Sequence, residues 1–214
     1  VHHCGAPLPP RVSNKPDMTS PQAHTPYSTH AVNPSDCGLP AIVWLASKSP
    51  RRLELLRTLG VHAQVFLAQT GAAAEELEAP HAGEAPLDYV KRVTALKLHT
   101  ARQALLDALQ KGQQTSLGAV NLIVASDTTV ALNGEILGKP GNEAEALGML
   151  RALSAAVHQV HTGVAVGCLE SGWTNQVVNT SDVEFAPLPE AFIQAYVRSG
   201  EPFDKAGGYG IQGI

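Results

Sequence analysis

The amino-acid sequence predicts an α/β protein in which a mixed, twisted β-sheet is flanked by helices. Strand-like and helix-like segments alternate from about residue 41 onward, which is typical of this fold class. Residues 121–126 (NLIVAS) include four consecutive apolar positions, as expected of a central strand that is covered on both faces. Asn133-Gly134 is a strong signal for a tight hairpin, so at least one pair of strands should be antiparallel.

Length and composition limit the kinds of protein that this chain can be. Its 214 residues fit one domain or two small lobes that share a cleft, and its hydrophobic content of 44% suffices for a sizeable core. A net charge of −4 excludes a generally basic nucleic-acid-binding protein but allows a local basic patch. No apolar run approaches the roughly 20 residues of a membrane span. The three cysteines lack CxxC spacing, which argues against disulfides or zinc and favours a reducing, cytoplasmic setting.

Residues 1–38 differ from the rest of the chain. They are rich in Pro, Ser, Thr, His and Asn and show no hydrophobic periodicity, which is typical of a disordered tail. They also lack the apolar segment of a secretory signal. We therefore expect a disordered tail over 1–38 and a folded domain over 39–214.

The folded domain should begin with a short strand over 41–45 (AIVWL) and a helix that starts at Pro50. Residues 47–49 supply N-cap chemistry, Pro50 suits the first helical position, and Gly60 suits a helix stop. The helix carries an apolar stripe made of Leu53, Leu56 and Leu59.

A strand over 61–68, a loop over 69–85 and a long helix over 86–111 are predicted next. An apolar inner line with a spacing of three or four residues supports the helix. This line consists of Val90, Thr94, Lys97, Ala101 and Leu105. Lys97 stands out because a lysine is rarely buried without a partner, although it could also lie at the edge of the line with its amine in solvent.

Four further elements are expected after the hairpin at Asn133-Gly134. They are a helix over 142–153, strands over 160–170 and 173–185, and a helix over 189–199. His158 and His161 lie three residues apart in a segment that reads as a strand, so they should point to opposite faces. This geometry argues against a metal site that the two histidines would share.

The segment SKSPRR, residues 47–52, directly follows a strand and opens a helix. Ligands gather at the carboxyl ends of strands in open α/β sheets, and a helix N-terminus offers free N–H groups and partial positive charge. The hydroxyls of Ser47 and Ser49 and the guanidinium groups of Arg51 and Arg52 add donors. The segment could therefore cradle a triphosphate, although a capped surface helix with solvated arginines explains it equally well in isolation.

Three further features could carry chemistry. Asp127 lies just past the apolar strand, where a carboxylate is costly to bury unless it is paired, metal-bound or at an open strand end; its alternative role is to cap a turn. Lys139 lies in a Gly-Lys-Pro turn, which suits a lysine that reaches a phosphate or simply an exposed turn. The glycines of EPFDKAGGYGIQG (201–213) favour close approach of backbone to a ligand, or a flexible terminal loop.

In this order, the motifs resemble those of the Maf family, the septum-formation-like nucleotide pyrophosphatases. The matching stretches cover about 41–213 and are LASKSPRRLELLRTLG, VASDTTVALNGEILGKP, EALGMLRALS with VHQVHTGVAV, and EPFDKAGGYGIQG. The resemblance implies a two-lobed α/β fold with the nucleotide in the cleft between the lobes. It also implies hydrolysis of a nucleoside triphosphate to the monophosphate and pyrophosphate, with Mg or Mn as the divalent metal.

The resemblance further implies roles for individual residues. Asp127 matches the family's catalytic acid, described as the proton acceptor, and is a candidate metal ligand together with Glu78. The family usually has Asp-Glu where this chain has Leu77-Glu78, so Glu78 is placed by its distance of six residues to Glu84. The substrate-specificity positions are Arg51, Thr128 and Gln212. The phosphate-binding set is Ser47, Ser49, Arg52, Lys97 and Lys139.

The subgroup and the partners follow from the same resemblance. SPRR together with YGIQG looks like the subgroup that acts on dTTP and UTP. Family members continue past the position of Ile214 through another strand and a helix, so either this sequence is a piece of a longer chain or this form lacks an element of the core. We expect a nucleoside triphosphate as the partner, neither a nucleic acid polymer nor a membrane, and a homodimer is compatible with the sequence. The competing class is a non-catalytic nucleotide-binding regulator of cell division, against which Asp127 beside the full basic set argues.

Overall fold

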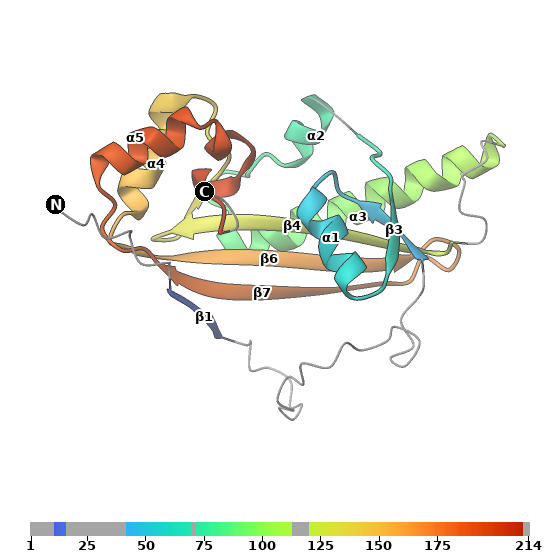
Figure 1. Cartoon of the computed structure of the whole chain (residues 1–214). Coiled ribbons are helices and arrows are strands. Elements are labelled where there is room, and N and C mark those ends of the chain that lie inside the picture. The colour runs from blue at the N-terminus through green and yellow to red at the C-terminus, as the bar shows by residue number, and fades with distance from the viewer. Residues whose placement is uncertain (1–10, 16–41, 70–71, 113–119, 212–214) are drawn as a thin grey trace.

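The computed structural model describes residues 11–15, 42–69, 72–112 and 120–211. Seven strands of this part form one sheet in the order β1-β7-β6-β4-β2-β3, and β5 pairs with β4 (Figure 1). The strands are β1 (Arg11–Lys15), β2 (Ile42–Ala46), β3 (His62–Val65), β4 (Leu122–Leu132), β5 (Glu135–Leu137), β6 (Val157–Cys168) and β7 (Thr174–Glu184). The helices are α1 (Pro50–Thr58), α2 (Ala72–Leu77), α3 (Pro86–Gln110), α4 (Glu143–Leu153), α5 (Glu190–Arg198) and the short 3-10 helices η2 (Glu201–Asp204) and η3 (Ala206–Gly208).

The strand pairing confirms the predicted mixed α/β class. Strand β2 runs parallel to both β3 and β4, because a helix precedes each of these two strands, α1 before β3 and α3 before β4, and returns the chain to the same end of the sheet. Strands β4, β6, β7 and β1 are joined in antiparallel pairs. The tight hairpin between β4 and β5 is also confirmed, since both Asn133 and Gly134 have the positive φ angles that such a turn needs.

Two of the three hydrophobic clusters among the described residues mark the two lobes of the molecule, and the third lies where the start of α3 packs against β5 and β7. The larger core lies between helix α3 and strands β2, β4 and β6; among its buried residues are Trp44, Leu105 and Ile123. The smaller core joins helices α4 and α5 through Leu150 and Ile193. Figure 1 shows α4, α5 and the C-terminal segment gathered at one end of the long strands, with α1 and β3 toward the other end. Strand β4 contributes to both parts and carries Asp127 between them.

Strand β4 has an open stretch along one edge. Its pairing with β2 ends at Ala46 opposite Ala125, and its pairing with β5 begins at Val130. Within the described ranges, no strand covers residues 126–129 on that side, whereas β6 pairs along the other side throughout. The sequence predicted that Asp127 lies just past the end of the strand. The structure instead places it in the middle of β4. The strand continues because β6 supplies hydrogen-bond partners, while the end of β2 still opens the edge beside Asp127.

Other predicted elements need correction. The loop predicted over 69–85 contains helix α2, which lacks a periodic apolar pattern and is packed through Leu77 against Tyr89 and Val90. The strand predicted over 61–68 ends at Val65. In helix α1 the predicted apolar stripe is only partly packed: Leu53 and Leu56 are half-buried, whereas Leu59 at the end of the helix is 55% exposed.

Residues 11–15 of the predicted tail form strand β1, which pairs antiparallel with β7. The prediction of a disordered tail is wrong for this stretch. Backbone groups at a sheet edge can bind a strand whatever its side chains, so the pairing leaves little trace in the pattern of hydrophobic residues. The rest of the predicted tail, 1–10 and 16–38, lies outside the described residues.

The two histidines of β6 lie on opposite faces of the strand, as predicted. His158 is hydrogen-bonded to Tyr209 of the C-terminal segment, whereas His161 is hydrogen-bonded to Thr180 of β7. Both side chains are buried, and burial lowers the pKa of each. In the part of the chain that the structure covers, no helix is long and apolar enough to cross a membrane.

Candidate nucleotide site at the open edge of strand β4

The turn from β2 into α1 brings the first group of polar residues to the open edge. Ser49 is the N-cap residue and Pro50 opens the helix, but the Ser49 side chain makes no capping hydrogen bond. Instead, the buried Ser47 Oγ accepts from the Ser49 N–H at 3.2 Å and from Arg52 Nη1 at 3.0 Å. The sequence predicted that the hydroxyls of both serines act at this turn, but it is the Ser47 hydroxyl that holds it.

Arg52 ties this turn to strand β4. Its guanidinium donates to the Ser126 carbonyl at 2.7 Å and to Thr128 Oγ1 at 3.2 Å, and Thr128 Oγ1 lies 3.3 Å from Thr162 Oγ1. Burial lowers the pKa of Arg52, while the nearby Asp127 and Glu78 carboxylates act in the opposite direction; the group stays charged. These contacts contradict the alternative of a surface helix with solvated arginines, at least for Arg52.

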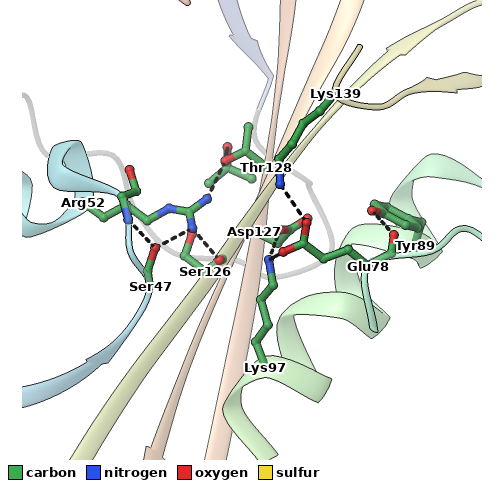
Figure 2. A network of polar contacts seen from close by, with 11 residues as sticks. Ser47, Arg52, Glu78, Tyr89, Lys97, Ser126, Asp127, Thr128 and Lys139 are labelled. Atoms are coloured by element: carbon green, nitrogen blue, oxygen red, sulfur yellow. Dashed lines mark hydrogen bonds and ion pairs between the residues drawn. The ribbon is translucent and has the colours of Figure 1, made fainter. Parts of the chain in front are cut away.

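The second group of charged residues lies around Asp127. The Lys97 amine is 2.6 Å from Asp127 Oδ1 and 2.7 Å from Glu78 Oε1. The Lys139 amine lies 2.9 Å from Glu78 Oε2. Figure 2 shows the four side chains converging from α3, β4, the end of α2 and the turn after β5. Lys97 therefore has two carboxylate partners, as expected of a lysine on the inner line of α3.

Opposite charges in this group balance one another. The Asp127 side chain is 11% exposed and that of Glu78 is 26% exposed, so both carboxylates depend on the lysines for compensation. Burial would raise the pKa of Glu78, but its ion pairs with Lys97 and Lys139 outweigh burial and lower that pKa. Two carboxylates and two ammonium groups leave no net charge, and the guanidinium of Arg52 makes the site positive.

The two groups lie on opposite faces of β4 and meet at its open edge. Consecutive side chains of a strand point to opposite faces, so Thr128 points toward Arg52 of α1 and Asp127 points toward Lys97 of α3. Figure 2 shows β4 running between them. A ligand that lies across the uncovered edge at 126–129 could contact both groups at once.

Arg51 points to a different place, the C-terminal segment. A Cβ atom at Gly210 would lie 3.1 Å from Arg51 Nη1 and 2.9 Å from Lys205 Cε. The absence of a side chain at Gly210 therefore lets this backbone approach the start of α1. Gln212, the third predicted specificity residue, lies outside the described residues.

The chemistry of Glu78 and Asp127 fits a hard divalent cation. Both carboxylates contact the same Lys97 amine, so their oxygens converge on one point. Magnesium is commonly held by one or two carboxylates together with substrate phosphates, and manganese favours the same oxygen ligands. A group of three or more His, Cys, Asp or Glu side chains suited to a metal does not occur among the described residues, so a phosphate would have to complete the ligand set.

Three contributors to the site were missed by the sequence analysis. Ser126 acts through its backbone carbonyl and Thr162 comes from a distant strand, so neither leaves a local signal. Tyr89 donates its hydroxyl to the Glu78 carbonyl at 2.7 Å. It precedes Lys97 by about two helical turns, and this spacing on one face of the helix could have revealed it. Burial raises the pKa of Tyr89, which keeps the hydroxyl a donor.

Comparison with known proteins identifies clear relatives. The family model of Maf-like proteins matches residues 42–214. A dTTP/UTP pyrophosphatase of Cupriavidus pinatubonensis is 47% identical over 176 residues, covering 80% of this chain and 80% of that protein. Proteins of the same name from Ralstonia nicotianae and Dechloromonas aromatica are 46% and 41% identical, each over 80% of this chain and over 78% and 81% of their own lengths.

Proposed function

The chain belongs to the Maf family, and we propose that it hydrolyses nucleoside triphosphates, dTTP and UTP above all, to the nucleoside monophosphate and pyrophosphate. The observation that carries the proposal is the convergence of Arg52, Lys97 and Lys139 with two carboxylates at the open edge of β4. The names of the relatives, dTTP/UTP pyrophosphatases, support the choice of bases.

The basic residues would neutralise the triphosphate. Arg52 presents a planar guanidinium that can bind two phosphate oxygens, and the first turn of α1 offers backbone N–H groups and a partial positive charge. Lys97 and Lys139 would exchange their contacts with Glu78 for phosphate oxygens. Cationic groups held in place before the reaction stabilise the charge that builds up on the leaving pyrophosphate.

Asp127 would orient and deprotonate the attacking water. Its carboxylate is buried, lies 2.6 Å from the Lys97 amine and belongs to the stretch of β4 that no other strand covers on that side within the described ranges. Glu78 and Asp127 would hold a Mg or Mn ion, which supplies further charge neutralisation and lowers the pKa of water when bound. The reaction breaks the bond between the α and β phosphates, and the water oxygen joins the α phosphorus.

The base would be recognised near the C-terminal segment. Arg51 already lies against Gly210, and Gln212 follows the described segment by one residue. Uracil and thymine present an acceptor–donor–acceptor edge, which a glutamine amide and neighbouring backbone groups can match. A base that leaves these groups unpaired loses about 1–3 kcal/mol for each of them, and this difference would favour dTTP and UTP over purine nucleotides.

A screen of the ribo- and deoxyribonucleoside triphosphates with identified products tests the proposal. We expect dTTP and UTP to be cleaved fastest, pyrophosphate to be the direct product, and excess chelator to stop turnover. Asp127→Asn should lower kcat by about 100- to 10,000-fold, whereas Asp107→Asn on the exposed side of α3 should not. Orthophosphate as the direct product would refute the reaction. Tight binding of dTTP without turnover would instead support a nucleotide-binding regulator.

A further inference from the structure

The segment that carries Glu78 is held by a second set of contacts that the proposed reaction does not use. Glu78 lies between the six-residue helix α2 and helix α3. A helix of this length is too short to be stable by itself. The packing of Leu77 and the hydrogen bond from the Glu78 N–H to the Ala74 carbonyl, at 3.2 Å, attach Glu78 to this short helix. Its position relative to Asp127 therefore depends on contacts that tie the segment to the rest of the molecule.

Two side chains from the first turns of α3 bind the backbone of this segment. The Tyr89 hydroxyl donates to the carbonyl of Glu78 at 2.7 Å, and Arg92 Nη2 donates to the carbonyl of Ala79 at 3.0 Å. Arg92 also forms a two-pronged ion pair with Glu84 at 2.6 and 2.7 Å. Its guanidinium carbon lies 5.5 Å from the centre of the Tyr89 ring, so the two side chains also support each other.

Glu84 closes the same set of contacts from the other end of the segment. Its carboxylate accepts the His81 N–H at 3.0 Å, and its own N–H donates to the His81 carbonyl at 3.1 Å. Gly83 adopts the left-handed conformation that this turn requires. Tyr89, Arg92 and Glu84 thus bind the segment at Glu78, at Ala79 and at His81.

These contacts matter most when the lysines are engaged elsewhere. In the present structure the Glu78 side chain is held by Lys97 and Lys139. In the proposed reaction both lysines turn to phosphate oxygens, and Glu78 then loses its side-chain partners. The hydrogen bonds from Tyr89 and Arg92 to the backbone at Glu78 and Ala79 would then still tie this segment to α3, beside Asp127.

We propose that Tyr89 and Arg92 are positioning residues that hold the Glu78 carboxylate at the divalent-cation position while the lysines bind phosphate. The assignment of Glu78 rests on the proposed function, but the positioning does not require turnover. Groups that orient metal ligands typically contribute about 10- to 100-fold to metal affinity or activity. Neither residue belongs to the proposed phosphate-binding set, so the affinity for the nucleotide itself should change little.

Tyr89→Phe is the most direct test, because it removes one hydroxyl and keeps the buried ring. Mn²⁺ binding is measured by electron paramagnetic resonance with a non-hydrolysable α,β-imido analogue of dTTP bound. We expect about 10-fold weaker Mn²⁺ binding and faster hydrogen exchange at residues 77–84, with the affinity for the analogue at saturating Mn²⁺ within about threefold. In a Glu78→Gln background, the same substitution should change Mn²⁺ binding by less than about twofold, because positioning acts only through Glu78.

Arg92→Lys provides a second variant, which keeps the charge but loses the two-pronged geometry. Its matched control is Arg151→Lys, since Arg151 makes the same kind of paired contact with Glu190 in the other lobe. Only Arg92→Lys should weaken Mn²⁺ binding. Equal effects of the two variants, or a full effect of Tyr89→Phe in the Glu78→Gln background, would overturn the inference. If no nucleotide is cleaved but Mn²⁺ binding responds as expected, the positioning stands and the proposed function fails.

Discussion

Removal of the Lys97 amine should destabilise the protein and change its response to metal. Lys97→Met keeps the length of the side chain but leaves Asp127 without its cation and Glu78 with Lys139 alone. Breaking a buried ion pair by removal of one partner costs about 3–5 kcal/mol. Because the Lys97 side chain is still 19% exposed, we expect the lower end, about 3 kcal/mol. For a chain of this size that corresponds to a fall in Tm of roughly 6–12 °C.

The variant should regain stability from Mn²⁺ more strongly than the wild type does, because Asp127 has then lost its lysine and Glu78 keeps only Lys139, so the two carboxylates attract a divalent cation more strongly. Thermal unfolding with and without Mn²⁺, in the absence of nucleotide, measures both effects. Arg151→Met is the matched control, since the Arg151 and Glu190 side chains are 51% and 49% exposed and solvent screens their attraction. The reasoning is refuted if Lys97→Met lowers Tm no more than Arg151→Met, or if Mn²⁺ raises the Tm of both variants equally.

Three further predictions concern the scaffold. Burial lowers the pKa of His158 to about 4 from its ordinary 6.5. As the pH falls, the histidine therefore takes up a proton in the unfolded chain before it does so in the folded protein, and roughly 3 kcal/mol of folding stability should be lost between pH 6.5 and pH 4. Urea titrations at several pH values should show a weaker pH dependence of stability in His158→Phe. Gly163→Ala would place a Cβ 2.3 Å from the buried Thr94 Oγ1 and should cost about 1–3 kcal/mol, part of which Thr94→Ala should restore in calorimetry. Removal of residues 1–38 takes away β1, whose partner among the described strands is β7, and β6 separates β7 from β4 in the sheet order. We therefore expect kcat to stay within about twofold of wild type, and a larger change would show that the edge strand affects the site.

Much of the fold could be predicted from local patterns. The long helix α3 was predicted because apolar residues recur every three or four positions, and Val90, Ala101 and Leu105 are indeed buried. The β4–β5 hairpin was predicted because Asn-Gly accepts positive φ angles. Helix α2 and strand β1 could not be predicted in this way, because tertiary contacts and backbone pairing hold them and no amphipathic pattern of their own does.

The residue types of the site were determined by the sequence, but their partners were determined by the tertiary structure. Motif and spacing picked out Asp127, Lys97 and Arg52 as candidates. Lys97 and Asp127 meet across 30 positions of the chain, and Arg52 reaches Ser126 across 74. Such pairs depend on how α3 and α1 cross opposite faces of β4, and no local pattern encodes that crossing. The open edge at residues 126–129 likewise arises where β2 stops before β5 begins, because strand register is set by the packing of the whole sheet.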